Sequence, residues 1–441
     1  MNRYFFGSIR YLLVVFLFPL LSSGPAFSQA LTLDEAIRIG LEKNPNILRA
    51  REDINVAKSQ QLQARSALMP KIEAKATYLP NQFEKSIVPE EFKPLLGSTK
   101  YDPTYEYMLE LDIIQPLFTG GKIWHANQQA SLNVSVSREK LRQSQNELVL
   151  SITQAFDGVI LAREYIQVVQ EAINLTEENL QVIRARYRNG ETLEFELIRA
   201  EVELLNLKPQ LIEAKNKLEL ANSGLKYLLG MDPNEKLEVS GNLTLSEFNP
   251  DLNNCFQTAL EKRPEVAQLN YQKNIIHHLV RSTQAGYSPD LAAVFQYTPQ
   301  SNSITNNWQQ GYMGLLVLSV PIFNGFYTHG KINEAKGLLT SVSIGLNQLK
   351  DGIKLEVEQA YLNLHESREI VEANQETVKK AERSVEIAKA QYAVGYITSL
   401  DMMGARLSLT QARTNYLKSL YDFIVAKAQL EKAMGTIGAK G

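Results

Sequence analysis

Apolar side chains recur every seventh residue along one long stretch of the chain, residues 121–188. The first series is Ile152, Val159, Ile166, Ile173, Leu180 and Tyr187, and the second is Leu148, Ala155, Ala162, Val169, Thr176 and Ile183. These two series occupy the a and d positions of successive heptads. The pattern predicts one long helix that supercoils left-handedly with partner helices, because 3.5 residues per turn is fewer than the 3.6 of a straight helix.

The same pattern returns 205 residues later and predicts a second long helix over 326–392. At 1.5 Å per residue, each long helix measures about 100 Å. Shorter helical patterns cover 32–68, 192–229, 251–287 and 397–434, each roughly 55 Å long. Two of these end to end match one long helix. We therefore expect a cylinder in which long helices alternate with stacked pairs of half-length helices.

Alternation of apolar and polar residues marks two pairs of strands, at about 71–118 and about 289–323. Between Tyr105 and Ile113 the odd positions are apolar and the even positions are mostly acidic. Lipid-facing barrel strands show this pattern, with apolar side chains outward and polar ones toward the lumen. A soluble hairpin lying on a core would show it too, so the strands alone leave both interpretations open. Four strands cannot enclose a lumen, so a barrel requires several copies of the chain.

The chain consists of two related halves. Residues 42–45 (Glu-Lys-Asn-Pro) recur as residues 261–264 (Glu-Lys-Arg-Pro), an offset of 219, whereas residues 115–120 match residues 320–325 at an offset of 205. The length difference falls between Pro80 and Pro116, where we expect a longer surface loop in the first half. The predicted division is a first repeat, a mid-height linker, a second repeat and a tail, at 31–230, 231–250, 251–435 and 436–441.

The first 30 residues are expected to be a secretory signal peptide. Arg3 and Arg10 make its start basic, Tyr11 to Leu21 form an apolar core, and small residues follow up to Ala30. This core is too short to cross a bilayer of ~30 Å as a helix. No cysteine near the cleavage region is available for lipid attachment. No apolar run of transmembrane length follows, so a mature chain that spans a membrane must do so as a closed β-barrel.

Composition excludes several classes of function. The chain has 46 basic and 48 acidic side chains, a net charge of −2, which argues against nucleic-acid binding. Cys255 is the single cysteine, so a cysteine-based metal site is excluded, and the five histidines offer no i, i+4 pair on a helix. The sequence lacks a Gly-x-Ser-x-Gly elbow, a Walker loop and a zinc motif. We expect no catalytic residue, no metal and no cofactor.

Taken together, these features resemble the TolC-type outer-membrane efflux proteins, the outer membrane factors. The resemblance rests on the duplicated strand-and-heptad pattern, the Pro-x-Phe-x-Gly strand exits, and the turns 186–190 (Arg-Tyr-Arg-Asn-Gly) and 391–395 (Gln-Tyr-Ala-Val-Gly). It covers about 31–435. It implies a mainly α fold with a membrane β-barrel part: a duplicated long-helix α-barrel and four barrel strands per chain, closed as a homotrimer with a 12-stranded barrel.

The function implied is that of an exit duct in the outer membrane of a Gram-negative-type cell. The barrel would contact outer-membrane lipid, and the helical tunnel would hang into the periplasm. An inner-membrane pump would drive substrate of a tripartite efflux or type I secretion system, and a periplasmic adaptor would join pump and duct. The main alternative is a periplasmic coiled-coil adaptor or scaffold without a pore, which normally has one helical hairpin where this chain has two.

In the family, rings of carboxylates close the periplasmic end of the duct. The resemblance places Asp401 at the tip aspartate and Glu196, 205 residues earlier, at its counterpart. Three copies of each near one axis would favour cations and raise one another's pKa. An alternative for Asp401 is that it only caps helix 397–434, because acidic residues are favoured in a first helical turn.

Four further residues belong to the implied tip. Tyr187 and Tyr392 match the tip tyrosines that hold the closed state by hydrogen bonds, although both also lie on the heptad seam and packing is an alternative role. Gly190 and Gly395 are expected to make the turns, where a positive φ favours glycine.

Two positions depart from the family pattern at this tip. Gly404 stands where some members carry a second acidic ring, and Ile397 stands where some carry a basic residue that locks the tip. The expected closed state is therefore less salt-bridged than in the best-known members.

Overall fold

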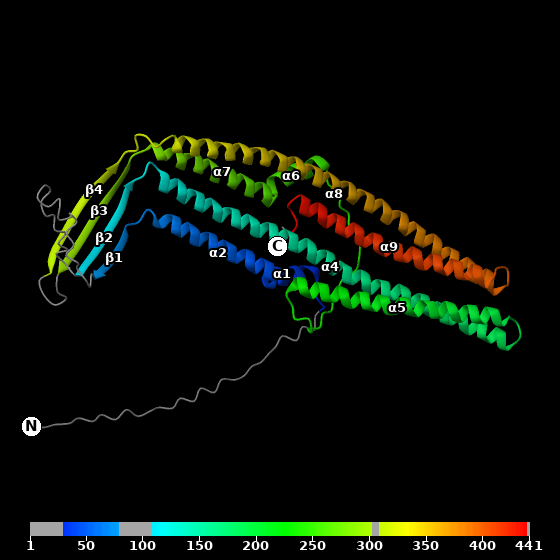
Figure 1. The fold of residues 1–441 in the computed structure, drawn as a ribbon. Helices are drawn as coiled ribbons and strands as arrows, with labels where there is room; N and C mark the ends of the chain where they lie inside the picture. The colour runs from blue at the N-terminus through cyan, green and yellow to red at the C-terminus, as the bar shows by residue number, and fades with distance from the viewer. Residues whose placement is uncertain (1–29, 79–106, 302–307, 439–441) are drawn as a thin grey trace, which may run out of the picture.

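The computed structural model describes residues 30–78, 107–301 and 308–438. The signal peptide expected over 1–30 lies outside these residues except for Ala30, as does most of the longer loop expected after Pro80. The described chain is elongated, with a sheet at one end and two helical hairpins that end together at the other (Figure 1).

Each half contains one helix of 67 residues and several shorter ones. The first half comprises α1 (Leu33–Lys43), α2 (Pro45–Ser66), α4 (Lys122–Arg188) and α5 (Glu194–Leu229). The second half comprises α6 (Leu252–Lys262), α7 (Pro264–Gln284), the 3₁₀ helix η2 (Ala285–Tyr287), α8 (Tyr327–Ala393) and α9 (Ser399–Ala433). No helix among the described residues is both long and apolar enough to cross a membrane.

The helices expected over 32–68 and 251–287 are each broken in two, which corrects the sequence interpretation. Pro45 begins α2 and Pro264 begins α7, and the residue before each proline is extended, with ψ of 128° at Asn44 and 129° at Arg263. A proline disfavours the α conformation of the residue before it and removes a helical N–H. A one-residue break barely alters the apolar periodicity, so the pattern alone does not reveal it.

The half-length helices stack end to end beside the long ones. Figure 1 shows α2 and α5 in line along α4, and α7 and α9 in line along α8. The first joint is the place where the break between α1 and α2 meets the end of α5. There the Asn44 side chain donates a hydrogen bond to the main-chain oxygen of Leu228, 2.8 Å away. The expected alternation of long helices with stacked pairs is therefore confirmed.

Gly230 makes the first joint possible. It has a φ of 66°, and a Cβ there would lie 2.8 Å from the main-chain oxygen of Lys43. Gly435 ends α9 against the α6–α7 break in the same way, with a φ of 70° and a distance of 3.0 Å to the main-chain nitrogen of Arg263.

Gly230→Ala is expected to destabilise the folded chain by about 2 kcal/mol or more, because it combines an unfavourable φ with a backbone clash. The apparent melting temperature should fall by several degrees. Gly224→Ala is the matched control, since a Cβ at this position of α5 meets nothing within 4 Å. That substitution should raise stability by roughly 0.5–1 kcal/mol. Equal melting temperatures for the two variants would contradict the close approach at the joint.

The two halves share one sheet. It has the order β1 (Lys71–Tyr78), β2 (Tyr107–Phe118), β3 (Asp290–Ser301), β4 (Gln309–Ser319), with every neighbouring pair antiparallel. The pairing of β2 with β3 joins the first half to the second, for example through Leu111 and Tyr297. β4 ends at Ser319, a little before the expected end at about 323, because Pro321 cannot donate to a ladder.

The predicted heptad seam forms the core of the helical part. Ile152, Val159, Leu180 and Val169 on α4 are each at most 6% exposed, and their counterpart Val357 on α8 is fully buried. Burial of these positions confirms that the heptad seam packs against neighbouring helices. The main core cluster draws on α4, α8, α9 and the ends of the half-length helices.

The linker, residues 231–250, crosses the helices at mid-height. Leu31 and Val239 form a parallel bridge, and Arg163 of α4 donates to the main-chain oxygens of Val239 and Gly241 at 2.8 and 2.6 Å. Farther along, the Lys427 ammonium of α9 lies 5.3 Å from the Phe248 ring. The linker thus fastens both halves to each other half-way along the helices.

Candidate functional site

The two helical hairpins end in turns of the same construction. Gly190 has a φ of 73° and Gly395 a φ of 80°. In the first turn the main-chain N–H of Glu191 donates to the main-chain oxygen of Arg186. In the second turn the N–H of Tyr396 donates to the main-chain oxygen of Gln391, and both distances are 2.9 Å. A Cβ at either glycine meets nothing within 4 Å, so only the left-handed backbone requires glycine there. These glycines therefore lie where the sequence predicts the tip turns.

Glu196 connects the two hairpins. Its carboxylate accepts a hydrogen bond from the Ser399 hydroxyl at the start of α9. On its own helix it also pairs with Arg199, whose guanidinium donates at 3.1 Å. Arg199 in turn lies 4.5 Å from the centre of the Phe195 ring. The first turn of α5 is thus tied to the first turn of α9 by a half-buried, charged hydrogen bond.

Asp401 occupies the equivalent position in the second half but makes a different contact. It forms a capping box with Thr398, whose main-chain N–H and hydroxyl donate to the carboxylate at 2.9 and 2.6 Å. These two hydrogen bonds hold the pKa of Asp401 below its usual value. The capping role considered for Asp401 is therefore present. Its side chain is exposed, so the carboxylate also faces solvent.

The different contacts of Glu196 and Asp401 follow from the residue before each helix. Thr398 offers a hydroxyl at the N-cap of α9, whereas Leu193 at the N-cap of α5 has no side-chain hydrogen bond to offer. The Glu196 carboxylate is consequently not held by a cap and reaches Ser399 instead.

The tip tyrosines lie near the same junction. The guanidinium of Arg186, at the end of α4, lies 5.4 Å from the centre of the Tyr392 ring at the end of α8. Tyr187 is 39% exposed. The structure gives neither tyrosine hydroxyl a hydrogen bond to another described residue, so within one chain Tyr392 joins the hairpins through its ring.

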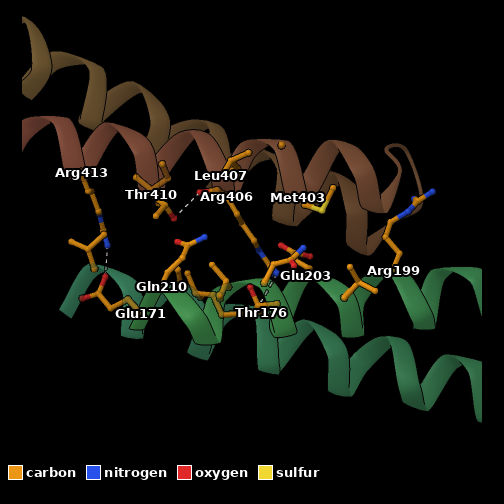
Figure 2. Close-up of a pocket in the computed structure, with 18 of the residues that line it drawn as sticks. Glu171, Thr176, Arg199, Glu203, Gln210, Met403, Arg406, Leu407, Thr410 and Arg413 are labelled. Atoms are coloured by element: carbon orange, nitrogen blue, oxygen red, sulfur yellow. Dashed lines mark hydrogen bonds and ion pairs between the residues drawn. The ribbon is translucent and has the colours of Figure 1, made fainter. Parts of the chain in front are cut away.

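A cavity of about 560 Å³ lies just above the tips. Its walls come from α4 and α5 of the first hairpin and from α9 of the second (Figure 2). Most of the lining is apolar, with Arg199, Arg406 and Arg413 and the carboxylates of Glu171 and Glu203 among it. Arg413 pairs with Glu171 of α4 and, at 3.0 Å, with Glu382 of α8. A second set of ionic contacts therefore joins the hairpins above the Glu196 contact.

Sequence reasoning assigned no role at the tip to Ser399, Arg199 or Arg186, although Arg186 begins the quoted turn 186–190. Arg199 follows Glu196 by three residues on one helix, a spacing that brings side chains together, so this pair was visible in the sequence. The contacts of Ser399 and Arg186 cross from one hairpin to the other. They depend on how far each helix extends, which a periodic pattern fixes only to within a few residues.

The polar contacts at the tip join side chains of one hairpin to side chains of the other. The described residues contain no group of three or more His, Cys, Asp or Glu placed to hold a metal ion.

The sequence profile described as "Outer membrane efflux protein" matches residues 36–231 and 255–436. The chain belongs to the outer membrane efflux protein family. The two matched segments correspond to the two halves, and the gap between them falls on the linker. The TolC-type resemblance inferred from the turns and strand exits is confirmed.

Known efflux and secretion proteins resemble the chain over most of its length. The alkaline protease secretion protein AprF of Pseudomonas aeruginosa is 23% identical over 420 residues, covering 92% of this chain and 85% of AprF. The outer membrane protein TolC of Escherichia coli is 21% identical over 435 residues, covering 95% and 85%.

A solved structure shows the same fold. The CmeC outer membrane channel of Campylobacter jejuni matches with a TM-score of 0.76 at 19% identity, covering 92% of this chain and 85% of CmeC. The helical part and the membrane β part expected from the sequence are therefore confirmed as the fold class. The pore-less scaffold gains no support from these relatives.

Proposed function

We propose that this outer membrane efflux protein is the passive exit duct of a tripartite efflux or type I secretion system. The observation that carries the proposal is the family match across both hairpins and all four strands. Conduction needs a pore, a constriction and docking surfaces, and it needs no catalytic residue. The chain lies in the outer membrane, and its helices extend into the periplasm.

The working form is a homotrimer. The strand order leaves β1 and β4 as the edges of a four-stranded sheet. Three copies joined edge to edge give 12 strands, enough to close around a lumen. Leu316 and Leu318 of β4 are 69% and 64% exposed in the single chain, which suits a surface that meets outer-membrane lipid.

An inner-membrane pump and a periplasmic adaptor complete the pathway. The relatives include a protein named for alkaline protease secretion and another, from Cupriavidus metallidurans, named for cobalt-zinc-cadmium resistance. Proteins and metal ions differ so widely that the pump, more than the duct, must choose the cargo.

The tip of the hairpins is the gate of this duct. Glu196, Ser399, Arg186 and Tyr392 hold the hairpins together in the closed state, with Gly190 and Gly395 forming the turns. In the trimer, three copies of Asp401 form the acidic ring, with Glu196 and Tyr187 beside it. Rings of carboxylates favour cations.

The first test is planar-bilayer conductance of the mature protein. Discrete current steps with a preference for cations are expected from a detergent-stable trimer. A monomer that stays soluble without detergent and gives no conductance would overturn the duct and favour the scaffold.

Asp401→Asn should reduce the preference for cations several-fold in reversal-potential measurements, because three carboxylates leave the ring. The same substitution also weakens the cap of α9. Thr398→Ala serves as the control, since it removes the capping hydroxyl and keeps the charge. Equal cation selectivity in both variants would mean that Asp401 only caps α9 and does not contribute to an acidic ring.

A further inference from the structure

The cavity above the tips contains a charge that the gate does not use. The Arg406 side chain extends from α9 toward Glu203 on α5 (Figure 2). One of its terminal nitrogens donates to the main-chain oxygen of Leu175 at 3.1 Å, and its Nε is buried without a hydrogen-bond partner. Arg406 forms no ion pair with any described carboxylate. Its positive charge is therefore only partly compensated.

The other charged groups that face the cavity are accounted for. Arg199 pairs with Glu196, and Arg413 pairs with Glu171 and Glu382. Glu203 is the remaining charged side chain of the lining, and it differs from Arg406 in one respect. A guanidinium stays charged at any physiological pH, whereas a carboxylic acid can release its charge by taking a proton. Burial raises the pKa of Glu203, although Arg406 opposes this shift. Glu178 of α4 also acts on Arg406 but does not line the cavity. Among the three arginines of the lining, Arg406 is the one without an ion pair to a described carboxylate.

The rest of the cavity suits an apolar body. Val202, Leu400 and Leu407 are 49%, 54% and 67% exposed and line it together with Leu175 and Met403. The volume of about 560 Å³ lies within the range of small-molecule sites, which combine apolar walls with a few placed polar groups. Gly404, the position that lacks the second acidic side chain, also lines the cavity, so no carboxylate there repels an anion.

We propose that this cavity binds an amphipathic organic monoanion, with its carboxylate against Arg406 and its apolar body among Val202, Met403 and Leu407. An occupant touches both hairpins, because the walls come from α4 and α5 on one side and α9 on the other. Separation of the hairpins would break part of its contacts. A bound anion therefore stabilises the closed tip, a consequence that rests on the proposed gate.

The probe for the test is naphthalene-2-carboxylate, with the uncharged naphthalene-2-carboxamide as its matched partner. Both are titrated calorimetrically into the mature protein in lipid nanodiscs, and empty nanodiscs supply the blank for partition into lipid. We expect saturable binding of the carboxylate and at least tenfold weaker binding of the amide. Equal binding of the two probes, or no binding above the blank, would overturn the proposal.

Variants of the chain test separately the charge of Arg406 and the volume of the cavity. Arg406→Gln should weaken carboxylate binding at least tenfold, and Glu203→Gln should strengthen it several-fold. Gly404→Leu should abolish binding by filling the cavity, and a Cβ there meets nothing within 4 Å, so the chain should still fold. Gly224→Leu, an equally open position on α5 outside the cavity, should leave binding unchanged. Unaltered affinity in both Arg406→Gln and Gly404→Leu would place the ligand elsewhere.

Two further readouts follow. Affinity should rise as the pH is lowered through the raised pKa of Glu203, because the neutral acid no longer repels the anion, and this dependence should vanish in Glu203→Gln. Conductance should fall when the carboxylate is added. Binding without any change in conductance would reject the link to the gate and retain the site, because the calorimetry does not depend on channel function.

Discussion

Ser399→Ala should shift the duct strongly toward its open state. The substitution removes the hydroxyl that donates to Glu196 and accepts from Arg199 at 3.5 Å, and so breaks both hydrogen bonds between the starts of α5 and α9. The ion pair of Glu196 with Arg199 lies within α5 and would remain. The variant therefore tests the connection between hairpins without changing the charge of the tip.

The expected change in the ratio of open to closed channels follows from the number of protomers that lose the hydrogen bond. A hydrogen bond to a charged group contributes up to about 3 kcal/mol when buried, but Glu196 is 26% exposed, which reduces the value to roughly 1 kcal/mol. If the three protomers of the proposed trimer open together, the total is about 3 kcal/mol. This corresponds to about a hundredfold change in the ratio of open to closed channels. Single-channel recording measures that ratio directly.

Glu196→Ala should also open the tip, because it removes the bond from Ser399, and only the longer bond from Arg199 to Ser399 remains between the starts of the two helices. Glu191→Ala is the matched control: Glu191 also lies at the tip, but its carboxylate accepts from Asn189 of the same turn and, among the described residues, bonds to none on the other hairpin. Comparable opening by Glu191→Ala would mean that loss of negative charge, and not loss of the connection, releases the tip.

The fold was predictable because the same pattern of helices and strands occurs twice in the sequence. Two heptad seams and two pairs of alternating strands recur at fixed offsets, and the structure places them in two equivalent hairpins over one sheet. The prediction fails at two positions, Pro45 and Pro264. Each breaks a predicted helix at a single residue, and the apolar rows continue past the break almost in phase.

The contacts of the tip were predictable only in part. The offset of 205 residues pairs Glu196 with Asp401 and suggests equal roles. The structure gives them different ones, because the equivalent N-caps are Leu193 and Thr398. The partner of Glu196 lies on the other hairpin, and the position of one hairpin relative to the other is set by packing along the whole length of the helices. Local sequence does not contain that information.

Asp157 shows the same limit inside the core. It lies on α4 at mid-height and is 7% exposed, and one of its carboxylate oxygens is buried without a hydrogen-bond partner. Tyr421 of α9 lies beside it and donates its own hydroxyl to the main-chain oxygen of Gln154, 3.4 Å away. Heptad reasoning assigns core positions to apolar residues, so a buried aspartate next to Phe156 is not expected from the pattern.

Asp157→Asn should therefore stabilise the protein at neutral and alkaline pH. Burial raises the pKa of Asp157 from 3.8 to about 6. The folded state thus binds a proton that the unfolded state releases. The stabilising effect of that proton is fully present below about pH 4 and is lost as the pH rises through about 6. The difference in pKa corresponds to about 3 kcal/mol.

Melting curves of the wild type and the variant at several pH values measure this effect. Asp157→Asn should raise the apparent melting temperature at pH 8 and leave it unchanged near pH 4, where the wild-type carboxyl is already neutral. Asp422→Asn is the control, because Asp422 lies next to Tyr421 in sequence and is exposed. A gain that is equal at both pH values would attribute the effect to packing of the amide. A gain confined to the higher pH identifies the buried charge as the cause, since only ionisation of Asp157 changes between the two conditions at this position.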